Sequence, residues 1–262
     1  MMPSPCADCT RGCCRHYTVT VSGYDAWVIA KNLHLAPEQF LVTVPQNTPN
    51  ARGFYLDKTG TTYDIALDKT SADAEAPCVF WLELPGGIGR CGIYSLRPMV
   101  CQTYPAFLTG DVVGRRDDVL CADDAWRDGI LQRPVWRERL YRMQVDFEIY
   151  GLAIARWNHH VLHTPHPEHI SILGFYTYLM NYYARIEPIR AAIGESEWQA
   201  MCARWGAACM RGTSPLTSHV DELEPWSDVI ATIYDITMDF FPSDLPSAPA
   251  ETPGPVPEAL PL

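Results

Sequence analysis

The sequence centres on one stretch, which reads Cys91-Gly92-Ile93-Tyr94-Ser95-Leu96-Arg97-Pro98-Met99-Val100-Cys101-Gln102-Thr103-Tyr104-Pro105. It begins with one cysteine and contains a second, and a further cysteine, Cys78, precedes it. Four more lie near the N-terminus, at Cys6, Cys9, Cys13 and Cys14. Thiolate sulfur is a common ligand of structural zinc and of iron–sulfur clusters. We therefore expect the chain to fold so that these distant thiols meet around metal.

Composition limits the classes of protein to which this chain can belong. It has 262 residues, 47% of them hydrophobic, which is enough for one large domain or two small ones with a packed core. Its net charge of -11 argues against nucleic acid, whose binding depends on Lys and Arg, and against docking on an anionic membrane. No apolar run is long enough to span a membrane, and the N-terminus does not resemble a signal peptide. We expect a cytoplasmic protein.

The arrangement of the ten cysteines favours metal over disulfides. A reducing cytoplasm keeps thiols free, so disulfides, the alternative, would need an oxidising compartment. Cys6 and Cys9 have the C-x2-C spacing that lets two side chains reach one metal. Cys13 and Cys14 are adjacent, so one can ligate while the other serves a second metal or packs as a thiol. The wide separation of the two cysteines in the central stretch means that the fold itself would have to assemble their site.

Helices are expected soon after the first cysteines. Ser22 should open a helix, with Asp25 as its partner in a capping box. Pro37 suits the first turn of a second short helix, which would carry Phe40 and Leu41.

The segment that follows is more typical of strands. Residues 53–67 predict a hairpin, because two β-prone runs flank Lys58-Thr59-Gly60. The remaining expectations before residue 126 are a strand over 78–82, a loop over 86–89 and a short helix over 94–101 that Pro98 kinks or ends.

From Pro134 the apolar residues recur at steps of three and four, which is the pattern of amphipathic helices. Pro134 suits the first position of such a helix. Four helices are expected, over 134–161, 172–193, 197–210 and 226–240. Pro188 should kink or break the second of them near Glu187. Stripes of this kind are more typical of helix-on-helix core than of a cofactor site.

These patterns predict an α+β fold that is mostly helical. An N-terminal cysteine-rich metal module with a small hairpin would pack on a C-terminal helical layer. We expect the metal module over residues 1–125, the helical region over 126–241 and a Pro-rich disordered tail over 242–262.

The joint cysteine pattern resembles a known family. The N-terminal group, then Cys78-Val79-Phe80, then the Cys-x-Ile-Tyr-x2-Arg-Pro-x2-Cys-x2-Tyr-Pro run, is similar to the CxxCxxxxCC-type cysteine-cluster family of zinc- or iron-chelating proteins. The resemblance covers about residues 6–125. It implies a pool of eight metal ligands, namely Cys6, Cys9, Cys13, Cys14, Cys78, Cys91, Cys101 and Cys121. This chain departs from the family in having Ala122-Asp123 where Pro-Gly is usual and three residues, not four, before the cysteine pair.

The same resemblance implies cofactors and a function. Eight thiols are twice what one [4Fe–4S] cluster or one structural zinc requires, so either two centres form or four thiols support the others. The family includes flagellin lysine N-methylases, thought to carry an iron–sulfur cluster and to use S-adenosylmethionine, and this favours iron–sulfur over zinc. The leading expectation is a protein that binds a metal cluster. The alternatives are a methylase-like enzyme acting on a protein lysine, whose substrate site the helical region would shape, and a zinc-stabilised module whose proline-rich tail recruits partners.

Two residues of the central stretch are candidates for supporting a bound cofactor. Arg97 either pairs with a carboxylate or caps the short helix, or it donates to cluster sulfur or to an anionic substrate, since guanidinium suits anions. Tyr104 is expected to pack beside the cluster. Structural support of the metal ligands is the more common role for such residues.

Other candidates fit structural roles better. Five histidines, His159, His160, His163, His166 and His169, could include a metal-binding pair one helical turn apart, but a solvated helix end accounts for them better. His16 is expected to be an exposed loop residue rather than a ligand. Cys202 and Cys209 should be buried free thiols on one face of a helix. The sequence shows no P-loop and no Ser/His/Asp arrangement.

Overall fold

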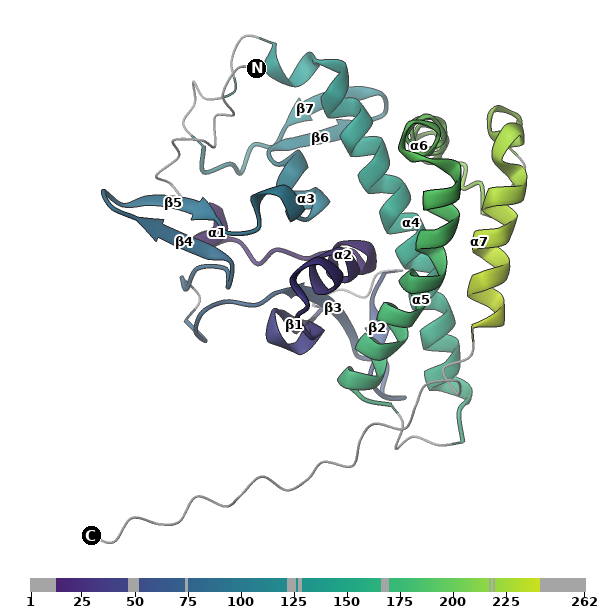
Figure 1. Cartoon of the computed structure of the whole chain (residues 1–262), viewed down its shortest axis with the longest axis horizontal. Coiled ribbons are helices and arrows are strands. Elements are labelled where there is room, and N and C mark those ends of the chain that lie inside the picture. Colours follow the sequence, from purple (N-terminus) through teal and green to yellow (C-terminus); the bar gives the residue numbers. More distant parts are fainter. Residues whose placement is uncertain are drawn as a thin grey trace, which may run out of the picture.

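The computed structural model describes residues 13–46, 52–73, 75–121, 126, 129–165, 170–216, 218 and 220–240. It confirms a mostly helical α+β fold. Figure 1 shows the long C-terminal helices side by side as a layer, with three small antiparallel sheets and the shorter helices next to it. The proline-rich tail predicted over 242–262 lies outside the described residues.

The first part of the chain builds a helix and a three-stranded sheet. After the short α1 (Cys13–His16) comes α2 (Gly23–Leu33), which begins with the predicted capping box. Ser22 Oγ accepts a hydrogen bond from the Asp25 N–H at 3.1 Å, and Asp25 Oδ2 accepts one from the Ser22 N–H at 3.2 Å. The sheet has the order β1 (Leu41–Pro45), β3 (Thr62–Leu67), β2 (Phe54–Tyr55).

The hairpin predicted over 53–67 is confirmed, with Phe54 opposite Tyr63. The second short helix is shorter than expected. It is a 3-10 turn, η1 (Pro37–Gln39), and Leu41 begins β1 instead of continuing a helix. The β-branched Val42, Thr43 and Val44 favour a strand, and the open edge of β3 supplies its partner.

A second hairpin joins β4 (Trp81–Leu84) to β5 (Ile88–Cys91). The predicted strand over 78–82 therefore starts later than expected, and the predicted loop over 86–89 is only partly a loop. Gly86 and Gly87 form the turn with positive φ, whereas Ile88 and Gly89 belong to β5. Gly89 is required for packing as well, because a Cβ there would overlap the Trp81 ring.

The central stretch forms two short helices rather than one. The 3-10 helix η2 (Tyr94–Leu96) ends before Pro98, and α3 (Met99–Thr103) begins directly after it. Pro98 thus separates the helices and provides the N-cap position of the second. A third hairpin, β6 (Ala106–Thr109) with β7 (Val112–Arg115), follows and was not expected from the sequence.

The C-terminal layer contains the four predicted helices, with the 3-10 helices η3 (Ile130–Gln132) and η5 (Asp221–Trp226) preceding the first and the last. They are α4 (Pro134–His163), α5 (Ile172–Ile193), α6 (Glu195–Met210) and α7 (Ser227–Asp239). Pro134 occupies the first turn of α4 as predicted. Pro188 does not break α5, which continues to Ile193. Burial of neighbouring side chains such as Ile186 offsets the hydrogen bond that a proline removes.

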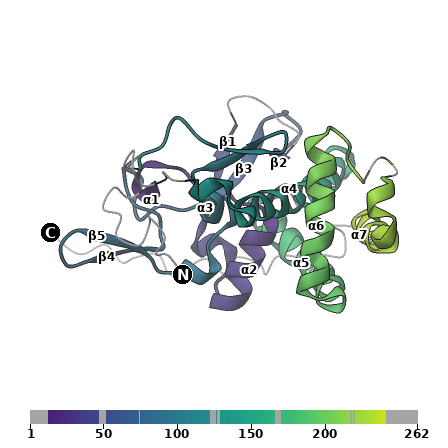
Figure 2. The same cartoon turned by 90° about the horizontal axis from the view of Figure 1, so that it is seen from above.

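One hydrophobic core joins the small sheet to the helical layer. Phe54 of β2 stacks on Phe175 of α5 with ring centroids 3.8 Å apart. Trp157 of α4 donates from Nε1 to the Tyr55 carbonyl at 2.7 Å, and Asn158 accepts from the Tyr55 N–H at 2.8 Å. The apolar stripes of the helices are therefore core, as predicted. Figure 2 shows α2 beside α5.

A smaller second cluster lies under the β6–β7 hairpin. It contains Ala106, Trp126, Leu131, Trp136 and Leu140. Among the helices of the described residues, none combines the length and the apolar composition needed to cross a bilayer.

Candidate metal centre

The structure describes six of the eight predicted ligands, whereas Cys6 and Cys9 lie outside the described residues. Different elements carry them. Cys13 and Cys14 begin α1, Cys78 precedes β4, Cys91 ends β5, Cys101 lies in α3, and Cys121 follows β7. All the cysteines that the structure describes are free thiols, so the disulfide alternative finds no support in this part of the chain.

Backbone contacts fix α1 against the segment that leads into β4. The Cys78 N–H donates to the Cys14 carbonyl at 2.8 Å. The Arg15 side chain continues this contact, because it forms an ion pair with Glu83 at 2.7 Å and lies over the Trp81 ring. In Figure 1, α1 lies at the base of the β4–β5 hairpin, with α3 nearby.

Four of these thiols gather in one region. Burial raises the pKa of the Cys101 thiol well above its usual range, and the charges of Cys13, Cys91 and Cys78 raise it further. Burial also raises the pKa of Cys78 and of Cys91, and Cys13 adds to both shifts. The backbone contact between Cys78 and Cys14 places α1 beside the segment of Cys78, and mutual effects on pKa weaken with distance, so the four thiols lie in one region of the fold. The fold thus brings together cysteines that lie up to 88 residues apart, from Cys13 to Cys101.

The thiols are gathered without a closed coordination shell. In the part of the chain that the structure describes, no three Cys, His, Asp or Glu side chains are placed so that they could hold one metal ion together. The kind of donor nevertheless fits, because soft thiolates suit zinc and iron–sulfur clusters. Burial keeps these thiols protonated, so a metal would have to displace their protons as it binds.

Cys14 and Cys121 have different surroundings. Cys14 packs against the main core, and a side-chain hydrogen bond with it is the largest cause of the raised pKa of Cys13. Cys121 packs against the second cluster, beside Tyr104, and its charge contributes to the raised pKa of the Tyr104 hydroxyl.

Arg97 lies next to the gathered thiols. Its Nε donates to the Tyr94 carbonyl at 3.1 Å, and its guanidinium stacks on the Tyr94 ring, 3.8 Å from the centroid. The hydrogen bond with Cys14 raises the pKa of Cys13 and burial raises that of Cys91, and the positive charge of Arg97 opposes part of both shifts. Arg97 therefore favours the thiolate form, which is the form that binds metal.

Tyr104 connects the two ends of the cysteine-rich part. Its hydroxyl accepts a hydrogen bond from the Leu120 N–H at 3.1 Å and lies 3.4 Å from the Tyr17 hydroxyl. The Tyr17 hydroxyl in turn donates to the Asp118 carbonyl. The Tyr104 side chain thus contacts both Tyr17, which follows α1, and the segment of Leu120, which precedes Cys121.

Comparison with known proteins gives one match. Residues 5–122 match the family named CxxCxxCC, which is described as a "putative zinc- or iron-chelating domain". Residues 5–122 thus resemble this family, and we call this part of the chain the CxxCxxCC domain. All eight predicted ligands fall within the matched residues, and the domain description supports metal binding. No curated protein and no solved structure matches the chain.

Sequence reasoning missed a second role of Asp25 in the CxxCxxCC domain. Besides capping α2, its buried carboxylate accepts a hydrogen bond through Oδ1 from the Met99 N–H at 3.0 Å. This contact joins the start of α2 to the start of α3, which carries Cys101. The capping box identifies the first role, but no spacing rule identifies a partner 74 residues away.

The other candidates lie outside the gathered thiols. His159 and His163 are exposed and their rings stack 4.2 Å apart, while His166 and His169 lie outside the described residues. His16 is exposed as predicted, but it ends the short helix α1 instead of lying in a loop. Cys202 is buried in the helical core, and Cys209 packs against that core, where burial raises its pKa to about 12.

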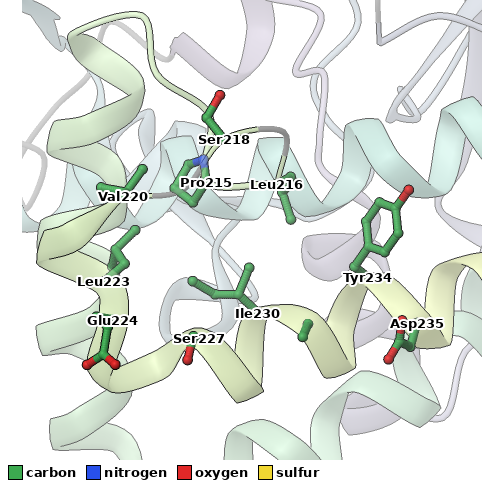
Figure 3. A pocket seen from close by; sticks show the side chains of 11 residues that line it. Pro215, Leu216, Ser218, Val220, Leu223, Glu224, Ser227, Ile230, Tyr234 and Asp235 are labelled. Carbon is green, nitrogen blue, oxygen red and sulfur yellow. The ribbon is translucent and has the colours of Figure 1, made fainter.

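One cavity is lined only by residues beyond the CxxCxxCC domain. It has a volume of about 230 Å³ and lies between α7 and the segment before it (Figure 3). Leu223 and Ile230 form its floor, and its lining contains no cysteine or histidine among the described residues. Its lining includes the carboxylates of Glu224 and Asp235, but among the described residues no three Cys, His, Asp or Glu side chains are placed to hold a metal there.

Proposed function

We propose that the CxxCxxCC domain holds an iron–sulfur cluster of the [4Fe–4S] type, with the eight cysteines of the sequence pattern as the pool of ligands. The observation that supports this proposal is the gathering of Cys13, Cys78, Cys91 and Cys101 from four separate segments of the chain. Four thiolates are the number that one such cluster requires. A bound cluster would supply electron transfer or would act as a structural staple.

Zinc is the competing metal, since four thiolates also complete a structural zinc site. The preference for iron–sulfur rests on the resemblance to flagellin lysine N-methylases. Anaerobic purification followed by metal analysis and visible absorption separates the two. Iron with inorganic sulfide and a broad visible absorption supports the proposal, whereas stoichiometric zinc in a colourless protein contradicts the choice of metal.

Substitution tests the ligand pool. Cys101→Ser and Cys91→Ser should each lower the metal content of the purified protein, because each removes a gathered thiol. Cys202→Ser is the matched control: it removes a buried thiol from the helical layer and should leave the metal content unchanged. Equal metal content in all three variants would show that the ligands lie elsewhere.

A methylase-like activity with S-adenosylmethionine on a protein lysine is the second candidate. The resemblance to flagellin lysine N-methylases favours it, whereas the cavity beside Arg97, of about 140 Å³, is smaller than the roughly 300–1,000 Å³ that is usual for pockets that enclose a ligand of this size. Saturable binding of S-adenosylmethionine to the cluster-loaded protein would support the enzyme. Without such binding the protein is a metal-binding module. The proposal also includes a cytoplasmic location for the protein. It further includes a metal module that ends at residue 125 and a helical region that ends at residue 241.

A further inference from the structure

The second cavity, of about 140 Å³, lies between α2, the central stretch and α4. Its polar lining comes from Tyr24, Asp25, Ser95, Arg97, Gln102 and Arg142. By volume it has room for about ten water molecules. Part of its wall is the same Arg-Pro segment that leads into α3 and Cys101.

The positive charge of Arg97 is not neutralised nearby. Its contacts are with the carbonyl and the ring of Tyr94, and no carboxylate in the described part of the chain pairs with it. Gln102 donates to the Arg97 carbonyl at 2.6 Å and so holds the backbone that carries this charge. The guanidinium therefore has donors left for a ligand.

Arg142 supplies the second guanidinium of the lining. Its Nη1 pairs with Glu195 at 3.0 Å, but its Nε is buried and has no hydrogen-bond partner among the described residues. A buried donor without a partner is uncommon in proteins, and a bound ligand is one explanation for it.

The carboxylate in the lining has its partners already. Asp25 Oδ1 accepts from the Met99 N–H, and its Oδ2 accepts from the backbone and the hydroxyl of Ser22. Both oxygens are thus occupied by the capping box and by the start of α3. The hydrogen bonds of Asp25 therefore go to these two segments rather than to the guanidinium of Arg97 or of Arg142.

We infer that this cavity binds the carboxylate of a small molecule and places it beside the gathered thiols. Guanidinium groups match a carboxylate with two parallel hydrogen bonds. Glu195 offsets the charge of Arg142 and Asp25 lies in the same lining, so the cavity carries at most the single positive charge of Arg97, which suits a monoanion better than a phosphate dianion. The inference that the cavity binds a carboxylate depends only on Arg97 and Arg142. That the bound carboxylate lies next to a metal centre rests on the proposed function.

Titration of the protein as purified with propionate, followed by ligand-observed NMR, tests this inference. Propionate should bind saturably, n-propanol should not bind, and inorganic phosphate should bind more weakly than propionate. Arg97→Gln and Arg142→Gln should each weaken propionate binding by about tenfold or more, the usual loss for a hydrogen bond to a charged group. Arg137→Gln, an exposed position on the same helix as Arg142, is the control and should bind propionate like the wild type.

Unchanged propionate affinity in Arg97→Gln would overturn the inference, and so would tighter binding of phosphate than of propionate. Should Arg142→Gln fail to fold, as judged by circular dichroism, Arg97→Gln still decides the result, because that side chain makes no ion pair in the described structure. Metal analysis of the same samples separates the two proposals. Protein without metal that binds propionate through Arg97 contradicts only the proposed function, whereas loaded protein that does not bind it contradicts only this inference.

Discussion

Asp25 and Met99 are joined by a buried hydrogen bond, in which the Met99 N–H donates to Asp25 Oδ1 at 3.0 Å. The same carboxylate closes the capping box of α2 with Ser22. One side chain thereby fixes the direction of α2 and the start of α3, and through α3 it fixes the position of Cys101. The orientation of Cys101, a candidate metal ligand, therefore depends on Asp25, which is not itself one of the candidate ligands.

Asp25→Ala should lower the free energy of unfolding by about 2–4 kcal/mol. The substitution removes a helix cap, worth about 1 kcal/mol, and leaves the buried Met99 N–H without an acceptor, which costs about 1–3 kcal/mol. Urea unfolding measures the change. Asp239→Ala, at an exposed position at the end of α7, is the control and should alter the stability by less than about 0.5 kcal/mol. Equal effects of the two substitutions would contradict the role of Asp25.

Asp146 predicts a dependence of stability on pH. Burial raises its pKa to about 7, while the charges of Arg142 and Arg190 lower it and those of Asp25 and Glu195 raise it. Because the folded state holds the proton more tightly than the unfolded state, this group stabilises the fold below about pH 4. That contribution is lost as the pH rises to about 7, and it is on the order of a few kcal/mol.

Asp146→Asn removes this titration. The variant should show a flatter stability profile than the wild type between pH 4 and 7 and should be the more stable of the two at pH 8. Urea unfolding at several pH values measures both slopes. Parallel profiles for the two proteins would show that Asp146 is not the group responsible.

Two glycines should respond to alanine in opposite ways. Gly151 lies within α4, where a Cβ would meet no atom within 4 Å, so Gly151→Ala should stabilise the protein by about 0.5–1 kcal/mol. A Cβ at Gly89 would overlap the Trp81 ring, so Gly89→Ala should destabilise it by about 1–3 kcal/mol. Thermal unfolding distinguishes the two. A gain in stability from Gly89→Ala would mean that β4 and β5 pair differently.

Removal of metal by a chelator should loosen the cysteine-rich part more than the helical layer. Structural metal sites contribute their binding free energy to the folding of the segments that ligate them. Hydrogen exchange should therefore quicken for the backbone amides of α1, β5 and α3, whereas amides of α5 and α6 keep their protection. Uniform quickening across the chain would indicate a metal that stabilises the whole core, and no change would indicate that the gathered thiols carry no metal.

The sequence predicted those features that depend on local signals. The Ser22–Asp25 box predicted the start of α2, and the three-and-four spacing from Pro134 predicted the helical layer. The strand β1 and the hairpin β6–β7 were missed, because strands of four or five residues carry a weak pattern and are stabilised by their partners. The prediction was that Pro188 would kink or break the helix; a break is wrong, since α5 continues to Ile193 and burial of neighbouring residues outweighs the local penalty.

In the candidate site, too, local sequence signals predicted some features, whereas others depend on contacts between distant segments. Spacing identified the cysteines, but only the fold shows that Cys13, Cys78, Cys91 and Cys101 gather while Cys121 lies beside Tyr104. The contribution of Arg142 was invisible in the sequence, since it lies on a helix far along the chain from the cysteines. Contacts between distant segments depend on the path of the whole chain, which local patterns do not encode.

The hydrogen bonds from α4 to β2 have a practical consequence for laboratory work on the cysteines. A fragment that stops near residue 125 would lose the Trp157 and Asn158 side chains that bind the backbone of Tyr55, and it would leave Phe54 without the ring of Phe175. Such a fragment would expose an apolar surface that α4 and α5 normally cover. We expect it to aggregate before metal could be bound. Reconstitution and spectroscopy should therefore start from protein that retains α4 and α5.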